Sequence, residues 1–363
     1  MKPVHRRRGA VPHDEPGIES DDSWVEAGGE LILAAGFTEA GFPYGTTIDQ
    51  YRKASVRYEP QAGWARAKHA IERVCSEAFQ REVDVGFVKL GGTGLSRDAF
   101  RAAVDDGGQE IDVYALVPNR FAAPGYDQRA VFELRLLAAL SQRELGIRVP
   151  KALGALRDRA GVILIEEVVE GLPLDLRAGR QGTVRPWVVV AEIAAEVHAL
   201  DLDGLPEGVR RSQDCRAYGE SHAASIGRDH PLLRAAAEWM LEHLPPREAC
   251  VLLHGDLLGQ NVHLGFGQPP GVLDWEWAEI GDPAYELAVV TRGVRQPFRL
   301  SNGLGQLLDE YSAAGGRPLT PARVAFYELG LLARQFQDAR IEAGDVLGAE
   351  DRLRGFLKRR GAG

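Results

Sequence analysis

The sequence HGDLLGQN at residues 254–261 is followed by GVLDWE at residues 271–276. The apolar residues that follow Asn261 and those that precede Asp274 can pair as a short β-hairpin. In that hairpin Asn261 and Asp274 face each other at the open end, within reach of Asp256. The spacing therefore predicts that three oxygen-bearing side chains, distant in sequence, meet at one place in the fold.

These residue types match the needs of phosphoryl transfer. A carboxylate such as Asp256 can orient and deprotonate a hydroxyl, while the Asn261 amide oxygen and the Asp274 carboxylate can hold Mg²⁺ against phosphates. Each residue alone has a simpler interpretation, as a turn cap, a strand end or a solvated loop carboxylate. All three in this order, with His254 before them and GDP at 281–283 after them, favour the functional interpretation.

The chain resembles the aminoglycoside phosphotransferase family, whose relatives include choline kinases and, more distantly, protein kinases. The motifs are HGDxxxxN at 254–261, DWE at 274–276 and GDPAYELA at 281–288. The resemblance implies an α+β, bilobal, protein-kinase-like fold with an antiparallel-sheet N-lobe and a mainly helical C-lobe. It extends more weakly from about residue 83 to about 345.

Carried over by position, the resemblance implies that Asp256 is the catalytic aspartate and that Asn261 and Asp274 bind magnesium. His254 would brace the catalytic loop through hydrogen bonds rather than accept a proton. Asp282 precedes Pro283, a pattern typical of a helix N-cap followed by the first helical residue, so we interpret it as structural.

The nucleotide side of the site is less sharply defined. A glycine-rich stretch, GGTGLSR at 91–97, resembles the phosphate-covering loop, where glycines let backbone amides approach phosphate oxygens. Its candidate phosphate contacts are Gly92, Thr93, Gly94 and Ser96. An ordinary hairpin turn is the simpler alternative.

Glu133 lies on a predicted helix, where kinases carry the glutamate that pairs with a strand lysine. A surface glutamate is the alternative. The position expected to hold the partner cation is Leu116, so either the assumed strand register is off or another cation acts, with Arg120 and Lys89 the nearest candidates.

Residues 166–171, EEVVEG, resemble the family's hinge. There the backbone groups of Glu167, Val168 and Val169 would hydrogen-bond an adenine edge. Backbone recognition leaves no side-chain signature, so ATP is expected and GTP stays open.

Across the cleft, four carboxylates could supply negative charge for an amine-bearing acceptor: Glu276, Glu279, Asp338 and Glu342. Each could equally be a solvated surface carboxylate.

Three domains are expected. Residues 1–80 form an N-terminal extension, poorly ordered over about the first 29 residues and then helical; residues 81–170 form the nucleotide-binding N-lobe; and residues 171–363 form the C-lobe. Extended runs are expected at 83–90, 99–104, 111–117 and 161–169, with a turn at 91–94. Helices are expected at 64–79, 129–145, 187–200, 232–244, 284–292, 304–313 and 321–343.

The composition and charge of the chain indicate which classes of binding partner to expect. The chain has 363 residues, 45% of them hydrophobic, and a formal net charge of -9, which gives nucleic-acid binding no support and would suit a cationic ligand. The three cysteines, Cys75, Cys215 and Cys250, show no metal or disulfide spacing. No secretion signal and no membrane-length apolar run is visible, so a cytoplasmic monomer or homodimer is expected.

We therefore expect an ATP- and Mg²⁺-dependent O-phosphotransferase that acts on a hydroxyl of a small molecule. By resemblance the acceptor is an antibiotic (an aminoglycoside, a tuberactinomycin-like peptide or a macrolide), with an amino sugar or amino alcohol as the alternative. The missing cation at Leu116 motivates a second alternative, a nucleotide-binding regulatory module without activity. A protein kinase is disfavoured, because residues 275–282 leave little platform for a peptide.

Overall fold

The computed structural model describes residues 24–27, 30–37, 43–47, 60–94, 96–122, 124–342 and 345–361. The chain divides into two compact units, Met1–Ala65 and Arg66–Gly363. In the first, β1 (Trp24–Ala27), β2 (Glu30–Phe37) and β3 (Pro43–Thr47) form an antiparallel sheet in the order β1-β2-β3. Residues 30–37 and 43–47 are thus strands where helix was expected, whereas residues 60–65 are the first residues of helix α2. The prediction of weak order before residue 29 falls mainly outside the described residues.

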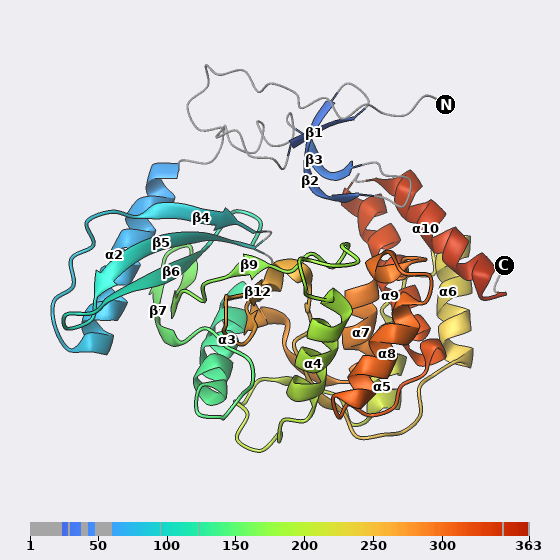
Figure 1. Cartoon of the computed structure of the whole chain (residues 1–363). Coiled ribbons are helices and arrows are strands. Elements are labelled where there is room, and N and C mark those ends of the chain that lie inside the picture. Colours follow the sequence, from blue (N-terminus) through green and yellow to red (C-terminus); the bar gives the residue numbers. More distant parts are fainter. Residues whose placement is uncertain are drawn as a thin grey trace. The chain divides into compact units, whose positions relative to one another are not determined.

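The second unit begins with an antiparallel sheet of five strands in the order β4-β5-β6-β8-β7 (Figure 1). A turn was predicted at residues 91–94, but residues 91–93 belong to the strand Lys89–Thr93. The pairing of this strand is irregular between Leu90 and Gly92. Residues 83–88 are not strand. The strands are β4 (Lys89–Thr93), β5 (Arg97–Asp105), β6 (Glu110–Pro118), β7 (Ala152–Asp158) and β8 (Gly161–Glu167).

Two helices accompany this sheet. Helix α2 (Pro60–Phe79) buries its small and branched side chains, and Val74 fits against Gly154 of β7, where a Cβ atom would lie 2.8 Å from it. Helix α3 (Tyr126–Leu140) packs against β7, β8 and the short helix η2 (Trp275–Trp277). Because η2 belongs to the second lobe, α3 connects the sheet to the residues that follow Asp274.

The remainder of the unit is mainly helical and shares one large apolar core. Most predicted helices are present with ends shifted by a few residues; α5 and α10 were not predicted. In the described part of the chain, no helix is both long and apolar enough to cross a membrane. The helices are α4 (Pro186–His198), α5 (Cys215–Ala224), α6 (Pro231–Glu242), α7 (Pro283–Thr291), α8 (Gly303–Ala313), α9 (Pro321–Glu342) and α10 (Val346–Arg359).

Two small sheets carry the motif residues between α6 and α7. One has the order β10-β14-β11 and the other β13-β12-β9. These strands are β9 (Leu172–Pro173), β10 (Arg210–Arg211), β11 (Val251–Leu253), β12 (Val262–Leu264), β13 (Gly271–Val272) and β14 (Glu279–Gly281).

The predicted hairpin exists, but its register was wrong by one residue. Val262 pairs with Val272 and not with the predicted partner, Leu273. The Leu273 amide donates to the Asn261 carbonyl oxygen at 2.9 Å. Gly271 is held by a second partner, since it also bridges Arg148. Asn261 therefore faces Leu273, and Asp274 begins the turn that follows.

Candidate functional site

The loop that carries Asp256 leaves β11 through a position that only glycine fits. Gly255 has φ of +83°, and a Cβ atom there would lie 2.2 Å from the Trp277 carbonyl oxygen. This close approach brings the turn after β11 against the turn after β13, so that Asp256 and Asp274 come from adjacent backbone segments.

His254 ties these two turns together from a fully buried position. Its Nε2 lies 2.8 Å from the Leu273 carbonyl oxygen, and the Asp256 amide donates to Nδ1 at 3.2 Å. The Glu286 carboxylate accepts hydrogen bonds from the amides of His254 and Gly255. Both ring nitrogens are thus engaged within the protein, so His254 positions the loop.

Asp256 is half-buried beside Asn261. The Asn261 Nδ2 donates to the Asp256 carboxylate at 3.0 Å and to its carbonyl oxygen at 2.8 Å. Burial raises the pKa of Asp256, and the charge of Asp274 adds to this rise. The amide nitrogen of Asn261 is thus committed to Asp256, which leaves its oxygen as the atom available to a cation.

Asp274 occupies a left-handed conformation, with φ of 65° and ψ of 61°. Such a backbone is uncommon outside glycine and costs about 1 kcal/mol or more. It turns the carboxylate away from the strand direction of β13 and toward the N-lobe, where Arg97 Nη2 binds its Oδ1. The distortion at Asp274 is the local feature that joins the two lobes at the site.

Arg97 was missed by the sequence analysis as a site residue. It is the first residue of β5 and is only 7% exposed. Its guanidinium forms a two-pronged ion pair with Glu133, one contact being 3.0 Å from Nη2 to Oε1. Neither Lys89, which is exposed at the start of β4, nor Arg120, which lies over the Phe121 ring, makes this contact.

The strand register explains how β5 can supply this cation. Ala99 pairs with Leu116, and Arg97 pairs with Pro118. Because side chains two residues apart share a face of a sheet, Arg97 lies on the same face as Leu116. Leu116 itself is buried in the core. The cation that pairs with Glu133 is therefore supplied by Arg97 of β5 and not by β6, on the same face of the sheet.

Glu133 joins the pair to the second lobe. It is 1% exposed, and its Oε1 also accepts the Trp275 amide at 3.0 Å. Burial raises the pKa of Glu133, whereas the nearby Arg97 charge opposes that rise. One buried arginine thus links the α3 carboxylate to the turn that carries Asp274.

Glu166 of β8 is a further buried carboxyl near this group. Burial, reinforced by the charge of Glu133, raises the pKa of Glu166 to about 8. At neutral pH the side chain is therefore mostly protonated, so it does not add a full negative charge beside Arg97.

This elevated pKa predicts a pH-dependent effect of Glu166→Gln on stability. As pH rises from about 4.5 to about 8, the unfolded glutamate releases its proton while the folded one retains it, so this group increasingly destabilises the fold. Glu166→Gln removes that cost, and at about 1.4 kcal/mol per pKa unit the gain is expected to reach roughly 4 kcal/mol by pH 8. Urea unfolding at pH 5, 7 and 9 measures it; a difference that does not vary with pH contradicts the assignment.

The predicted phosphate-contacting residues lie at the end of β4 and in the turn to β5. Gly92, Thr93 and Gly94 are exposed, and the Gly94 amide donates to the Arg97 carbonyl at 2.8 Å. Ser96 Oγ donates to Glu276 at 3.0 Å. The three exposed residues have accessible backbone next to Arg97, so their contact with phosphate stays a prediction.

The hinge residues use part of their backbone inside the protein. The backbone amide of Glu167 donates to the Lys151 carbonyl oxygen, and that of Val168 donates to the Asp112 carbonyl oxygen, both at 2.9 Å. The Val169 carbonyl oxygen lies 3.2 Å from His263 Nδ1. The predicted adenine contacts would have to use the remaining backbone groups of this segment.

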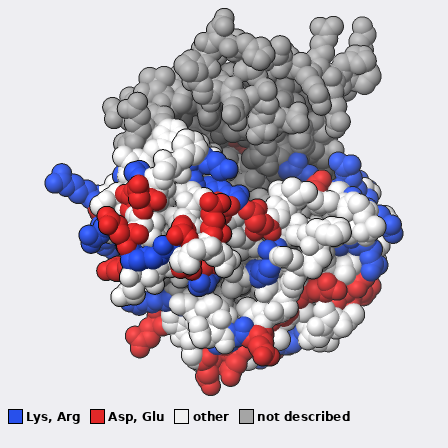
Figure 2. Space-filling model, turned by 60° about the vertical axis from the view of Figure 1, so that its left-hand side comes forward, with Lys and Arg blue, Asp and Glu red and all other residues white. Residues whose placement is uncertain are grey.

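Of the four predicted acceptor carboxylates, the three whose side chains are described have separate surroundings. Glu276 is buried between Ser96 and Arg129, with 3.6 Å between Arg129 Nε and its Oε2. Glu279 accepts the Tyr218 hydroxyl at 2.6 Å and pairs with Arg210. Asp338 is exposed on α9, and the Glu342 side chain lies outside the described residues. On the face shown in Figure 2, acidic and basic side chains are interspersed rather than gathered by sign.

Asp282 caps helix α7 from a fully buried position. Its carboxylate accepts the Ala284 amide at 2.9 Å, the Arg323 Nε at 2.9 Å and the Tyr327 hydroxyl at 2.9 Å. It thereby fixes the start of α7, the helix that carries Glu286 to the back of the catalytic loop.

Asp282→Ala is expected to destabilise the protein by about 3 to 5 kcal/mol, because it leaves the nearly buried Arg323 guanidinium without its main partner. Asp229→Ala is the matched control, since Asp229 pairs with Arg340 at the surface, and it should destabilise the protein far less than Asp282→Ala. Urea unfolding at pH 7 compares the two; equal losses would show that Asp282 has no special structural role.

Comparisons with known proteins identify phosphotransferases among the relatives of this chain. A family model described as "Phosphotransferase enzyme family" matches residues 93–327. Acyl-CoA dehydrogenase family member 11 from Gallus gallus is 32% identical over 124 residues, which is 32% of this chain and 16% of that protein. Viomycin phosphotransferase from Streptomyces vinaceus is 29% identical over 180 residues, 43% of this chain and 59% of that protein. The chain thus spans under a fifth of the first relative and under two thirds of the second.

Solved structures extend the likeness to the whole fold. A macrolide 2'-phosphotransferase from Brachybacterium faecium superposes with a TM-score of 0.55 at 22% identity, covering 78% of this chain and 97% of that one. Aminoglycoside phosphotransferases are comparably similar, one of them a ternary complex with ADP and hygromycin B. At such low identity these structures establish the bilobal kinase-like fold alone.

Proposed function

Because the chain belongs to the phosphotransferase enzyme family, we propose that it transfers the γ-phosphoryl group of ATP to a hydroxyl of a small molecule, with Mg²⁺. The observation that carries this proposal is the meeting of Asp256, Asn261 and Asp274 at adjacent turns, with Arg97 and Glu133 closing the site from the N-lobe.

Asp256 orients the acceptor hydroxyl and takes its proton as the oxygen attacks the γ-phosphorus. Its elevated pKa makes it a better base than an exposed aspartate. Asn261 holds the carboxylate in place through its amide nitrogen. The His254 ring and Glu286 fix the loop, so Asp256 needs little rearrangement when the acceptor arrives.

Mg²⁺ would be held by the Asn261 amide oxygen and the Asp274 carboxylate. No group of three or more His, Cys, Asp or Glu side chains fit to hold a metal occurs among the described residues, which suits an ion that takes its remaining ligands from phosphates and water. The ion would neutralise charge on the transferring phosphoryl group. Asp274, which is bound to Arg97 here, is a carboxylate already oriented toward the nucleotide side.

Arg97 would contact the nucleotide phosphates from the position next to Glu133. A guanidinium keeps its charge and presents several donors, so it can remain paired with Glu133 while it binds phosphate. This arrangement disfavours the inactive regulatory module, which was motivated only by the apolar residue at 116.

The acceptor class has two candidates. The names of the viomycin and macrolide phosphotransferases make antibiotics the first class to test. The failure of Glu276, Glu279 and Asp338 to gather into one acidic site favours a second class, small hydroxylated metabolites, over a polycationic antibiotic.

A coupled ADP-release assay tests the proposal. Wild-type protein with MgATP is screened against aminoglycosides, peptide antibiotics, macrolides, amino sugars, sugar acids and sugar phosphates, with Asp256→Asn assayed in parallel. Acceptor-stimulated ADP release by the wild type alone supports the proposal. Release that is never stimulated by an acceptor, or is equal in the variant, counts against it.

A further inference from the structure

Three helices each contribute a buried polar side chain to one chain of contacts that ends at the loop carrying Asp256. Helix α4 packs against both α7 and α8 (Figure 1). The three side chains are those of His198 at the end of α4, Glu286 on α7 and Tyr311 on α8. Tyr311 contacts His198, His198 faces Glu286, and Glu286 binds the loop.

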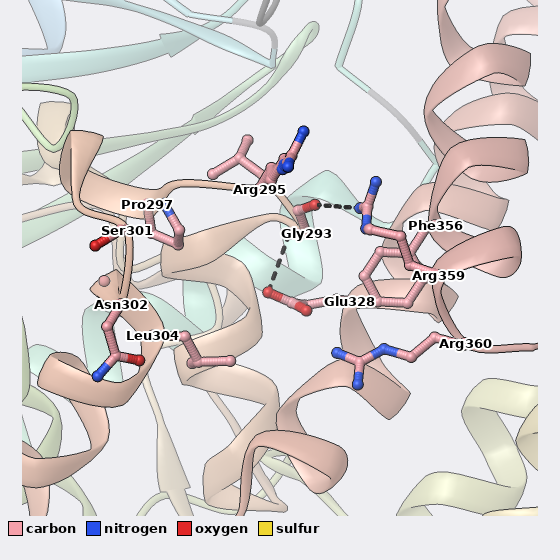
Figure 3. A pocket seen from close by; sticks show the side chains of 12 residues that line it. Gly293, Arg295, Pro297, Ser301, Asn302, Leu304, Glu328, Phe356, Arg359 and Arg360 are labelled. Carbon is pink, nitrogen blue, oxygen red and sulfur yellow. Dashed lines mark hydrogen bonds between the residues drawn. The ribbon is translucent and has the colours of Figure 1, made fainter.

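Helix α7 is anchored at both ends. Asp282 caps its start. At its other end Glu328 accepts the Thr291 hydroxyl at 2.5 Å and the Gly293 amide at 3.2 Å. Figure 3 shows the contact between Glu328 and Gly293, beside a pocket of about 200 Å³ that follows α7. Because the helix is fixed in this way, the orientation of the Glu286 carboxylate depends on the groups packed around it.

The Glu286 carboxylate is fully buried and holds the loop through both of its oxygens. Oε2 accepts the His254 amide at 2.5 Å and Oε1 accepts the Gly255 amide at 3.2 Å. Burial raises the pKa of Glu286, but the His198 and His254 rings outweigh burial and hold that pKa below its usual value. The carboxylate is therefore charged at neutral pH, and a buried charge needs compensating partners.

His198 is the partner that α4 supplies. Its Nε2 lies 3.9 Å from Glu286 Oε2, an electrostatic contact rather than a hydrogen bond at that distance. This nitrogen has no hydrogen-bond partner in the described part of the chain. On the other side of the ring, Nδ1 lies 2.8 Å from the Tyr311 hydroxyl oxygen, which also accepts the Arg317 amide and so has its own hydrogen free for Nδ1. A ring that accepts at Nδ1 carries its hydrogen on Nε2, the atom that faces Glu286.

We propose that His198, oriented by Tyr311, is a positioning residue for the reaction, whose Nε2–H group holds the Glu286 carboxylate against the loop and thereby keeps Asp256 aligned with the acceptor hydroxyl. The inference rests on the proposed function. His198 acts only through Glu286 and exchanges no proton in the reaction.

Removal of this N–H group has a pH-dependent consequence. Without it the buried carboxyl takes up a proton more readily, and a protonated carboxyl offers fewer acceptor sites to the two loop amides. The titratable groups that interact with Glu286 are His198 of α4, His254 of the loop, Tyr311 of α8 and Tyr285 of α7 itself. On α9, which also packs on α7, the buried groups Arg323, Tyr327 and Glu328 are engaged at the two ends of that helix.

The pH dependence of kcat tests the proposal. His198→Met removes the N–H group with little change in volume, so it should lower kcat about tenfold or more at pH 6, with the KM values nearly unchanged. The loss should shrink toward pH 8, where Glu286 regains its charge. His198→Gln keeps an N–H donor near the place of Nε2 and should restore most of kcat. Tyr311→Phe, which no longer fixes the tautomer, should have a smaller effect in the same direction and carries the test if His198→Met does not fold.

His230→Met is the control, because it removes a histidine that caps α6. It should lower stability in urea without changing the pH dependence of kcat. A loss of kcat in His198→Met that is the same at every pH, and that His198→Gln does not restore, would be general structural damage and would overturn the proposal.

Nuclear magnetic resonance without substrates separates failure of this inference from failure of the enzyme assignment. The His198 ring should show the tautomer protonated at Nε2, and the amide signals of His254 and Gly255 should shift in His198→Met and return in His198→Gln. This pattern without acceptor-stimulated turnover by the wild type supports the hold of His198 on the loop and counts against the proposed function. Turnover that His198→Met retains in full at every pH overturns the inference and leaves the proposed function standing.

Discussion

Asp256→Asn is expected to lower kcat about 100- to 10,000-fold, the range typical for loss of a general base. The asparagine keeps the size of the side chain and can still contact Asn261, but it cannot accept the acceptor's proton. Because the Arg97–Glu133 pair and Asp274 are untouched, the affinity for MgATP should change little. Steady-state ADP release and nucleotide titration measure the two quantities separately.

Gln260→Ala is a suitable control for this substitution, since Gln260 lies in the same loop but is exposed. It should retain most of the wild-type kcat. If Asp256→Asn instead kept full kcat, or lost activity only together with its folded structure, Asp256 would not be the base.

Arg97→Ala is expected to lower kcat/KM for ATP at least about 100-fold, because it removes a cation that contacts both Glu133 and Asp274. It also leaves the buried Glu133 without its ion-pair partner, which typically costs about 3 to 5 kcal/mol of folding free energy. Arg97→Lys keeps the charge but loses the fork geometry, so it should fall between wild type and Arg97→Ala. Kinetics are measured at a temperature where urea unfolding shows each variant folded.

Moving the charge back to the neighbouring strand separates catalysis from stability. Leu116→Lys places an ammonium on the same sheet face, beside the vacated position, and in the Arg97→Ala background it should restore part of kcat/KM for ATP. Leu116→Met in that background carries no charge and should restore none. Equal rescue by both would mean that Arg97 acts only through packing.

The sequence alone was enough to predict that Asp256, Asn261 and Asp274 lie near one another, because these residues are close together in the chain and lie on short connected elements. Asp256, Asn261 and Asp274 do come from adjacent turns. The hairpin register could not be derived, since Gly271 is also fixed by Arg148, a partner more than a hundred residues earlier. The left-handed backbone of Asp274 likewise follows from contacts between lobes, not from its local sequence.

Arg97 illustrates a different limit. Its signal was visible, because Arg97 is the basic residue that ends the glycine-rich stretch and lies two residues before Ala99 on the following strand. Assigning it to Glu133 required the β5–β6 register, and a shift of one residue would have placed Arg97 on the other face. Helix α5 was missed for another reason. Its segment, CRAYGESHAA, mixes small and polar residues, so its helical periodicity is weak although Tyr218 and Ala223 are buried.

Phosphorus NMR of the wild-type protein with MgATP and the best acceptor from the screen tests the central claim most directly. The account predicts that the γ-phosphate signal of ATP is replaced by those of ADP and a phosphomonoester of the acceptor, and that Asp256→Asn produces neither on the same time scale. Conversion of ATP to ADP and inorganic phosphate with an unmodified acceptor, or the same phosphomonoester from the variant, would contradict it.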